Sequence, residues 1–151
     1  MQVSFYVLVN TSVEKTLPKL VQKVFDSGAR CHIYSTSQTV LETLNDTLWT
    51  FSPLAFLPHG SESDPPHTHA KHPIWLAQNT SIVNDASVFI ALSPEKLDDL
   101  GDKGISRLIY FYAVHAPEAS DFKTLQHQIP DALIWQQNSD GGWVKQAPVP
   151  S

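Results

Sequence analysis

The stretch Val3-Ser-Phe-Tyr-Val-Leu-Val9 decides the fold of this chain. It is β-branched and aromatic, it is shorter than a typical helix, and turn-forming residues 10–12 close it, so it predicts a buried strand. The next segment predicts a helix, because Thr16 can cap its start, Pro18 falls in the first turn and Gly28 stands just past the end. Its apolar residues recur at helical spacing, at Leu17, Leu20, Val21, Val24 and Phe25. The chain therefore begins with a βα unit.

Later segments repeat this alternation of strand and helix. The strand-like segments are residues 31–34, 73–77, 87–92 and 107–113. After the first of them, Ser35 or Ser37 can cap a second helix, whose apolar stripe is formed by Val40, Leu41, Leu44 and Leu48. Strands interleaved with helices favour an α/β fold, a mostly parallel sheet with helices on both faces.

The C-terminal third is less regular. A short helical or irregular piece is expected around residues 94–100, and a helix over residues 117–128. Residues 132–137 can either resume as a helix or turn outward as a strand. With 151 residues, 42% of them hydrophobic, the chain is large enough to bury a core of its own. We expect one α/β domain over residues 1–146 and a disordered tail over residues 147–151.

Charge and cysteine content narrow the function. The formal net charge is −5 with ten lysines and arginines in all, which argues against a broad electrostatic footprint for nucleic acid, so contact with DNA should be indirect. The single cysteine, Cys31, is expected to be a small buried hydrophobe. The start of the chain lacks the pattern of a signal peptide, and no apolar run approaches the roughly 20 residues that span a bilayer. We expect a cytoplasmic protein with no membrane role.

The motifs of nucleotide enzymes and serine hydrolases are missing from the sequence. No glycine lies between Met1 and Gly28, so neither a P-loop nor a dinucleotide fingerprint can follow the first strand. The chain also lacks a Gly-x-Ser-x-Gly elbow. We therefore expect no catalytic residues and no cofactor.

A histidine cluster offers the alternative of a small metal-binding protein. His67, His69 and His72 lie within six residues, and imidazole is a common metal ligand. Their segment contains Pro65-Pro66 and reads as a loop, whose ordering entropy a metal ion would have to offset. The prediction is no metal site here, with the His67/His69/His72 loop as the alternative.

The segment from Leu48 to His59 is apolar and aromatic without a regular period. Pro53 and Pro58 interrupt backbone hydrogen bonding, so the segment predicts a shaped loop or a short edge strand. Such a loop can be a hydrophobic plug over the sheet. It can also be a partner-binding face, because contiguous exposed apolar patches mark interfaces.

Several of these segments together resemble the chi subunit of the bacterial DNA polymerase III holoenzyme, a clamp-loader accessory protein. The resemblance covers about the first 115 residues and rests on Phe5-Tyr-Val-Leu8, Gly28 to Ile33, Leu48-Trp-Thr-Phe51, Phe56-Leu-Pro-His59 and Pro73-Ile74. It implies a Rossmann-like fold without nucleotide and without catalysis. It also implies an adaptor that binds the psi subunit of the clamp loader and the C-terminal tail of single-stranded DNA-binding protein.

The resemblance also assigns two sets of site residues. Those expected to bind psi are Trp49, Phe51, Phe56, Leu57, Pro58 and His59. The tail of single-stranded DNA-binding protein is short and acidic and ends in an aromatic residue with a free carboxylate; it is expected to contact Lys123, His127 and Val114. Family members usually carry an arginine where this chain has His127, so one planar carboxylate clamp is replaced by a weaker group. From the residues alone, Lys123 and His127 would form an ordinary solvated helix face.

Overall fold

The computed structural model describes residues 1–9, 11–50, 59–61, 73–97, 100–138 and 142–146. Its elements are β1 (Gln2–Leu8), α1 (Val13–Asp26), β2 (Cys31–Tyr34), α2 (Gln38–Thr50), β3 (His59–Ser61), β4 (Ile74–Ala77), β5 (Val88–Ala91), the 3-10 helix η2 (Leu100–Lys103), β6 (Arg107–Ala113), α3 (Ala119–Gln128), β7 (Leu133–Gln137) and β8 (Trp143–Gln146).

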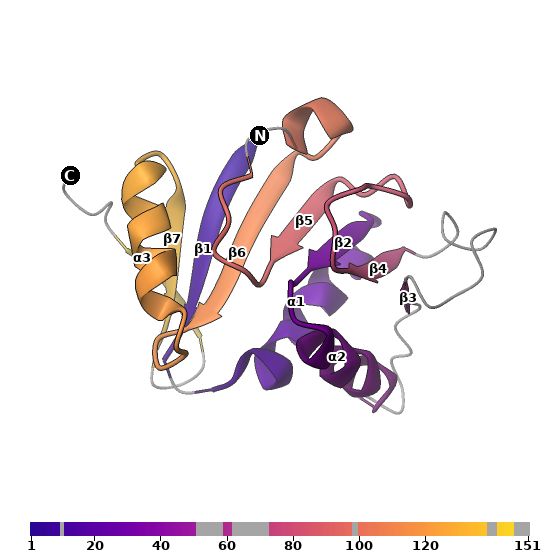
Figure 1. Cartoon of the computed structure of the whole chain (residues 1–151), viewed down its shortest axis with the longest axis horizontal. Coiled ribbons are helices and arrows are strands. Elements are labelled where there is room, and N and C mark those ends of the chain that lie inside the picture. The colour runs from indigo at the N-terminus through magenta and orange to yellow at the C-terminus, as the bar shows by residue number, and fades with distance from the viewer. Residues whose placement is uncertain (10, 51–58, 62–72, 98–99, 139–141, 147–151) are drawn as a thin grey trace.

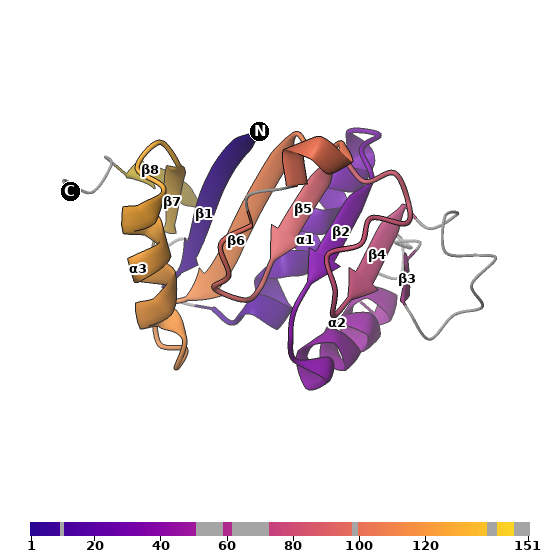
Figure 2. The same cartoon turned by 45° about the horizontal axis from the view of Figure 1, so that its top comes forward.

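The strands form one eight-stranded sheet in the order β3-β4-β2-β5-β6-β1-β7-β8. All neighbouring strands are parallel except β7 and β8, which are antiparallel. Helices α1 and α2 cover one face of the sheet and α3 covers the other (Figures 1 and 2). The expected Rossmann-like α/β fold, a mostly parallel sheet with helices on both faces, is confirmed.

Alternation along the strands divides the core into two layers. On β1, the buried side chains of Phe5 and Val7 join the cluster on the α3 face, whereas Leu8 joins the cluster on the α1 face. Central parallel strands are covered on both sides, and every residue of β2, β4 and β5 is buried; His32 is the polar residue among them. Leu17, Val21 and Val24 attach α1 to its layer.

The first helix begins earlier than its sequence indicates. We expected Thr16 as the N-cap, but α1 begins at Val13, and the backbone N–H of Thr16 donates to the Ser12 carbonyl at 3.3 Å. Thr16 is therefore already inside the first turn. Gly28 behaves as predicted: its φ of 85° is in the left-handed region, and its N–H donates to the Phe25 carbonyl at 3.0 Å.

The second helix runs further than predicted. Ser37 caps it, accepting a hydrogen bond from the Val40 N–H at 3.3 Å, and the helix continues to Thr50. Leu48 lies in the helix, as its place in the apolar stripe predicts, whereas Trp49 belongs to the last helical turn and not to the expected loop. Leu48 is buried at 1% exposure because it continues the core stripe of Leu41 and Leu44.

At the C-terminal end, the choice between helix and strand for residues 132–137 is resolved as the strand β7. It lies in parallel beside β1, with Tyr6 opposite Trp135. The hairpin partner β8 was not predicted. The piece expected near residues 94–100 takes the form of η2, which lies later, at Leu100–Lys103. Residues 147–151, expected to be a disordered tail, lie outside the described residues.

Candidate functional site

The α3 helix is the best-defined part of the candidate site, because its inner face is locked to the sheet. Phe122 is fully buried and stacks on Tyr112 with ring centroids 4.5 Å apart and an interplanar angle of 1°. The hydroxyl of Tyr112 donates to Gln126 Oε1 at 2.5 Å. Burial raises the pKa of Tyr112 to about 12, so this phenol keeps its proton at neutral pH. These contacts fix the rotation of α3 on the sheet.

The outer face of α3 presents the two predicted tail-binding residues. Lys123 and His127 are both exposed, and because they are four residues apart, their side chains are neighbours on one helical face. Within the described residues, no hydrogen bond or ion pair occupies either side chain. The structure therefore brings Lys123 and His127 together as predicted. It leaves both available to an anionic partner.

Val114 occupies a different position from the other two predicted tail-binding residues. It follows the last residue of β6, and its N–H donates to the Leu8 carbonyl at 2.9 Å. Its half-buried side chain packs against the core cluster beneath α3. Val114 can thus offer a small apolar surface near the C-terminal end of the strands, while the two polar residues stand on the helix.

A shallow hollow of about 250 Å³ flanks α3, and no sequence pattern indicated it. Its lining residues come from α3 and from the loop after β5: Pro94, Lys96, Asp121, Thr124, Leu125 and Gln128. With about 100° between successive residues of a helix, Thr124 and Gln128 lie about 100° around α3 from Lys123 and His127. The loop is held in place because the Tyr110 hydroxyl donates to the Glu95 carbonyl at 2.6 Å.

A carboxylate also fixes this loop. The Tyr34 hydroxyl donates to Glu95 Oε2 at 3.1 Å. Burial, with further contributions from this hydrogen bond and from the negative charge of Glu95, raises the pKa of Tyr34. The loop after β5 therefore forms one fixed wall of the hollow, and α3 forms the other. Among the described lining residues, Lys96 is the cation and Asp121 is the anion.

Of the predicted psi-binding residues, the structure describes the backbones of Trp49 and His59, at the other end of the sheet. Trp49 is in the last turn of α2 and His59 begins β3; their side chains, like Phe51, Phe56, Leu57 and Pro58 as a whole, lie outside the described part of the structure. The backbone is described at both ends of this segment. Its first end is the C-terminal end of α2, and its second end is the edge strand β3. Figures 1 and 2 show β3 and α3 at opposite ends of the molecule.

Other side chains that could support chemistry are held in the core. Cys31 is fully buried, and burial raises the pKa of its thiol to about 12, which disfavours the reactive thiolate. His32 is also buried, stacked on Phe89 at 4.7 Å, with Nε2 2.8 Å from the Asn79 carbonyl oxygen. The alternative metal ligands His67, His69 and His72 lie outside the described residues; among those described, no group of three potential ligands is found.

The crevice where doubly wound sheets usually bind nucleotides is present but has unsuitable chemistry. A hollow of about 430 Å³ lies where β1 and β6 end, and Thr11, Ser12, His115 and Glu118 contribute to its lining. Its loop contains no glycine to let phosphate approach the backbone, and the carboxylate of Glu118 would repel phosphate. This agrees with the loop sequence.

A family model described as DNA polymerase III chi subunit, HolC, matches residues 1–124. This chain belongs to the DNA polymerase III chi subunit family. A chi family relative, the probable DNA polymerase III subunit chi of Rickettsia prowazekii (strain Madrid E), is 37% identical over 93 residues, which is 62% of this chain. The match spans 55% of that relative's length. Membership in the chi family indicates an accessory role in DNA replication.

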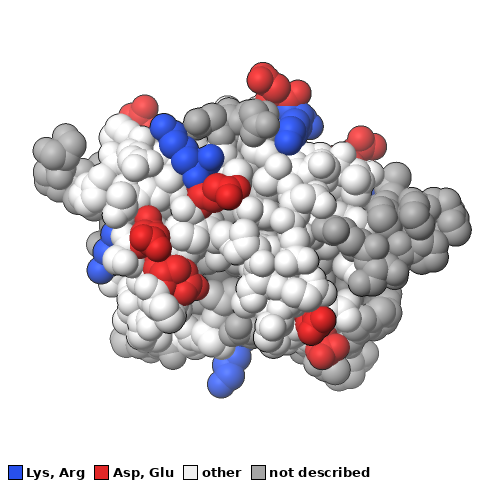
Figure 3. All heavy atoms as spheres, in the orientation of Figure 1, with Lys and Arg blue, Asp and Glu red and all other residues white. Residues whose placement is uncertain are grey.

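Charges on the surface agree with an accessory role through local contacts. In the space-filling view, basic and acidic side chains are interspersed across the visible face without a broad basic patch (Figure 3). Among the described residues of this chi family member, no helix has the length and apolar character needed to cross a membrane.

Proposed function

We propose that this protein is a non-catalytic adaptor of the replication machinery with two binding sites. One site, around Trp49, Phe56 and His59, binds the psi subunit of the clamp loader. The other, on α3, binds the acidic C-terminal tail of single-stranded DNA-binding protein. At these two sites DNA is reached through the partners, and no cofactor is required.

One observation carries the proposal: Lys123 and His127 form an exposed pair on a helix that the core holds rigidly. An acidic tail with a terminal carboxylate needs fixed donors that are not already paired, and no described residue occupies this pair. The buried stacking of Phe122 on Tyr112 prevents α3 from rotating away. Binding can therefore use side chains already in position, which lowers the ordering cost.

The separation of the two sites supports the adaptor role. The segment with Trp49 joins the sheet at β3, the first strand of the sheet order, whereas α3 leads into β7 at the opposite side. Two partners can then be bound at once without competing for surface. Aromatic anchors such as Trp49 and Phe56 commonly dominate an interface, which suits a permanent partner, while charged contacts suit a reversible one.

Sedimentation velocity tests the two-site adaptor directly. The intact protein is mixed with psi and with a fluorescent peptide that has the acidic tail of single-stranded DNA-binding protein. We expect the peptide to sediment with the complex of protein and psi. Trp49→Ala should lose psi and keep the peptide, and Lys123→Ala should do the reverse. If the peptide and psi displace one another, or if neither binds, the adaptor proposal is wrong.

A further inference from the structure

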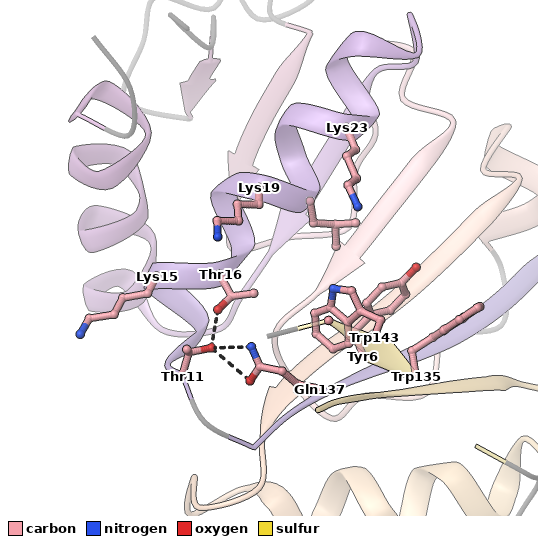
Figure 4. A pocket seen from close by; sticks show the side chains of 11 residues that line it. Tyr6, Thr11, Lys15, Thr16, Lys19, Lys23, Trp135, Gln137 and Trp143 are labelled. Atoms are coloured by element: carbon pink, nitrogen blue, oxygen red, sulfur yellow. Dashed lines mark hydrogen bonds between the residues drawn. The ribbon is translucent and has the colours of Figure 1, made fainter. Parts of the chain in front are cut away.

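A separate hollow of about 700 Å³ lies on the α1 face of the sheet, where β7 and β8 extend beyond the cover of α1. Its lining residues come from β1, α1, β7 and β8 and the turns beside them: Tyr6, Thr11, Lys15, Thr16, Lys19, Leu20, Lys23, Trp135, Gln137, Gly142 and Trp143. Figure 4 shows α1 along one side and the aromatic rings on the other. Neither of the proposed adaptor sites uses these residues.

The floor of this hollow is aromatic and partly open to solvent. Trp143 meets Tyr6 edge-on, with centroids 5.0 Å apart and an interplanar angle of 70°, and Trp135 lies 6.4 Å from Tyr6. All three side chains are only half-buried. Their mutual packing fixes flat ring surfaces at the edge of the sheet, where a planar ligand can stack.

The opposite wall is a row of cations. Lys15, Lys19 and Lys23 recur every four residues on α1, so neighbouring positions are about 6 Å apart along the helix axis. All three are exposed, and within the described residues none has a hydrogen bond or ion pair. In Figure 4, Lys23 extends toward the aromatic rings, whereas Lys15 points away from them. No carboxylate is among the described residues that line the hollow.

We propose that this hollow binds a short stretch of single-stranded nucleic acid. The phosphates lie along Lys19 and Lys23, with Lys15 at the end of the row, and one or two bases stack on Trp143 and Trp135. A regular row of cations beside stacking rings matches a polymer that repeats both a phosphate and a flat base. An acidic peptide would match the lysines but would leave the rings without regular partners. The net charge of −5 excludes a broad footprint but leaves room for this local contact.

Fluorescence anisotropy with a labelled oligothymidylate tests the site in the intact protein at 50 mM salt. We expect measurable binding that weakens with salt along a log–log slope between about −1.4 and −2.1, the values for two and three phosphate contacts, or roughly 7- to 18-fold on going to 200 mM salt. The double variant Lys19→Glu with Lys23→Glu should abolish binding. The matched control is the double variant Lys96→Glu with Lys103→Glu, two exposed lysines that do not line the hollow, and it should bind normally. Unchanged binding by the double variant, or no binding by the wild type, would overturn the proposal.

Tryptophan fluorescence tests the stacking of bases on Trp143 and Trp135 separately from phosphate binding. Bound oligothymidylate should quench tryptophan fluorescence, and Trp143→Leu should weaken binding about tenfold or more while far-ultraviolet circular dichroism stays unchanged. If Trp143→Leu unfolds the chain, quenching in Trp135→Phe supplies the same test. Competition by polyglutamate as strong as that by oligothymidylate would reassign the hollow to acidic peptides and overturn the nucleic-acid proposal. Tail-peptide binding should be unaffected by Lys19→Glu with Lys23→Glu, so the two proposals can fail independently.

Discussion

The two ends of this sheet are built differently, although both are assigned to partner binding. At the β3 end, the chain leaves the buried last turn of α2 and returns as an edge strand of three residues, and the candidate residues between are mostly aromatic or apolar. At the α3 end, two of the three candidate residues, Lys123 and His127, are polar and stand on a regular helix held by stacked rings.

The difference indicates how each site should respond to change. Apolar contacts gain their energy from burial, so truncating one anchor removes much of the affinity. Exposed charged contacts are screened and individually weaker. Substitutions at the β3 end should therefore lower binding affinity strongly and independently of salt. Substitutions at the α3 surface should lower binding affinity less, and their effect should depend on salt concentration.

The largest effect is expected beneath the α3 site. Phe122→Ala removes a fully buried ring stacked on Tyr112 and should destabilise the fold by about 3 to 5 kcal/mol, measured by urea unfolding. Ser120→Ala, on the exposed side of the same helix, is the control and should stay within about 0.5 kcal/mol of wild type. Equal midpoints for the two variants would show that the stacked rings do not anchor α3.

The next largest effect is expected on psi binding at the β3 end. Trp49→Ala and Phe56→Ala should each weaken psi binding by about 2 kcal/mol or more, since truncated aromatic anchors typically cost this much, while tail-peptide affinity stays constant. Isothermal titration calorimetry measures both affinities. Leu48→Ala is the neighbouring control: Leu48 is buried in the core, so this variant should lose stability. Loss of cooperative unfolding in both aromatic variants would instead place Trp49 and Phe56 in the core.

The fold was largely predictable because the parallel strands are short apolar runs bounded by turn residues. What the sequence could not give were features fixed by tertiary contacts. Residues 133–137 become a strand because they pair with β1, and β8 follows only once β7 exists to pair with it. The start of α1 was misplaced because capping preferences are local: Thr16 resembles a cap, but its hydroxyl hydrogen-bonds that of Thr11.

The candidate site was only partly predictable, for a related reason. Helical spacing was enough to put Lys123 and His127 on one face. The hollow beside α3 and the hollow on the α1 face could not be predicted, because each is lined by residues far apart in sequence. Lys96 and Thr124 line the first, and Lys23 and Trp143 line the second. The Lys15, Lys19 and Lys23 row was visible as a four-residue repeat, but its aromatic neighbours come from the unpredicted hairpin.

A smaller effect on tail-peptide affinity is expected at Lys123, the cation on α3. Lys123→Ala should weaken tail-peptide binding by about 1 to 3 kcal/mol, the range for a hydrogen bond to a charged group, and the loss should shrink as salt rises. Calorimetry at two salt concentrations measures it. Lys19→Ala removes an exposed lysine of the other face and should leave tail binding unchanged. Equal tail-peptide affinities for Lys123→Ala and Lys19→Ala would show that the tail does not bind at Lys123 on α3.

The smallest effect concerns His127. His127→Arg should strengthen tail-peptide binding, because guanidinium is always charged and forms a bidentate fork with a carboxylate. His127→Gln cannot carry a positive charge and should bind the peptide no better than the wild type. Calorimetry with the same peptide at pH 7.5 measures both affinities. Equal affinities for His127→Arg and His127→Gln would leave Lys123 as the charged contact on this helix face.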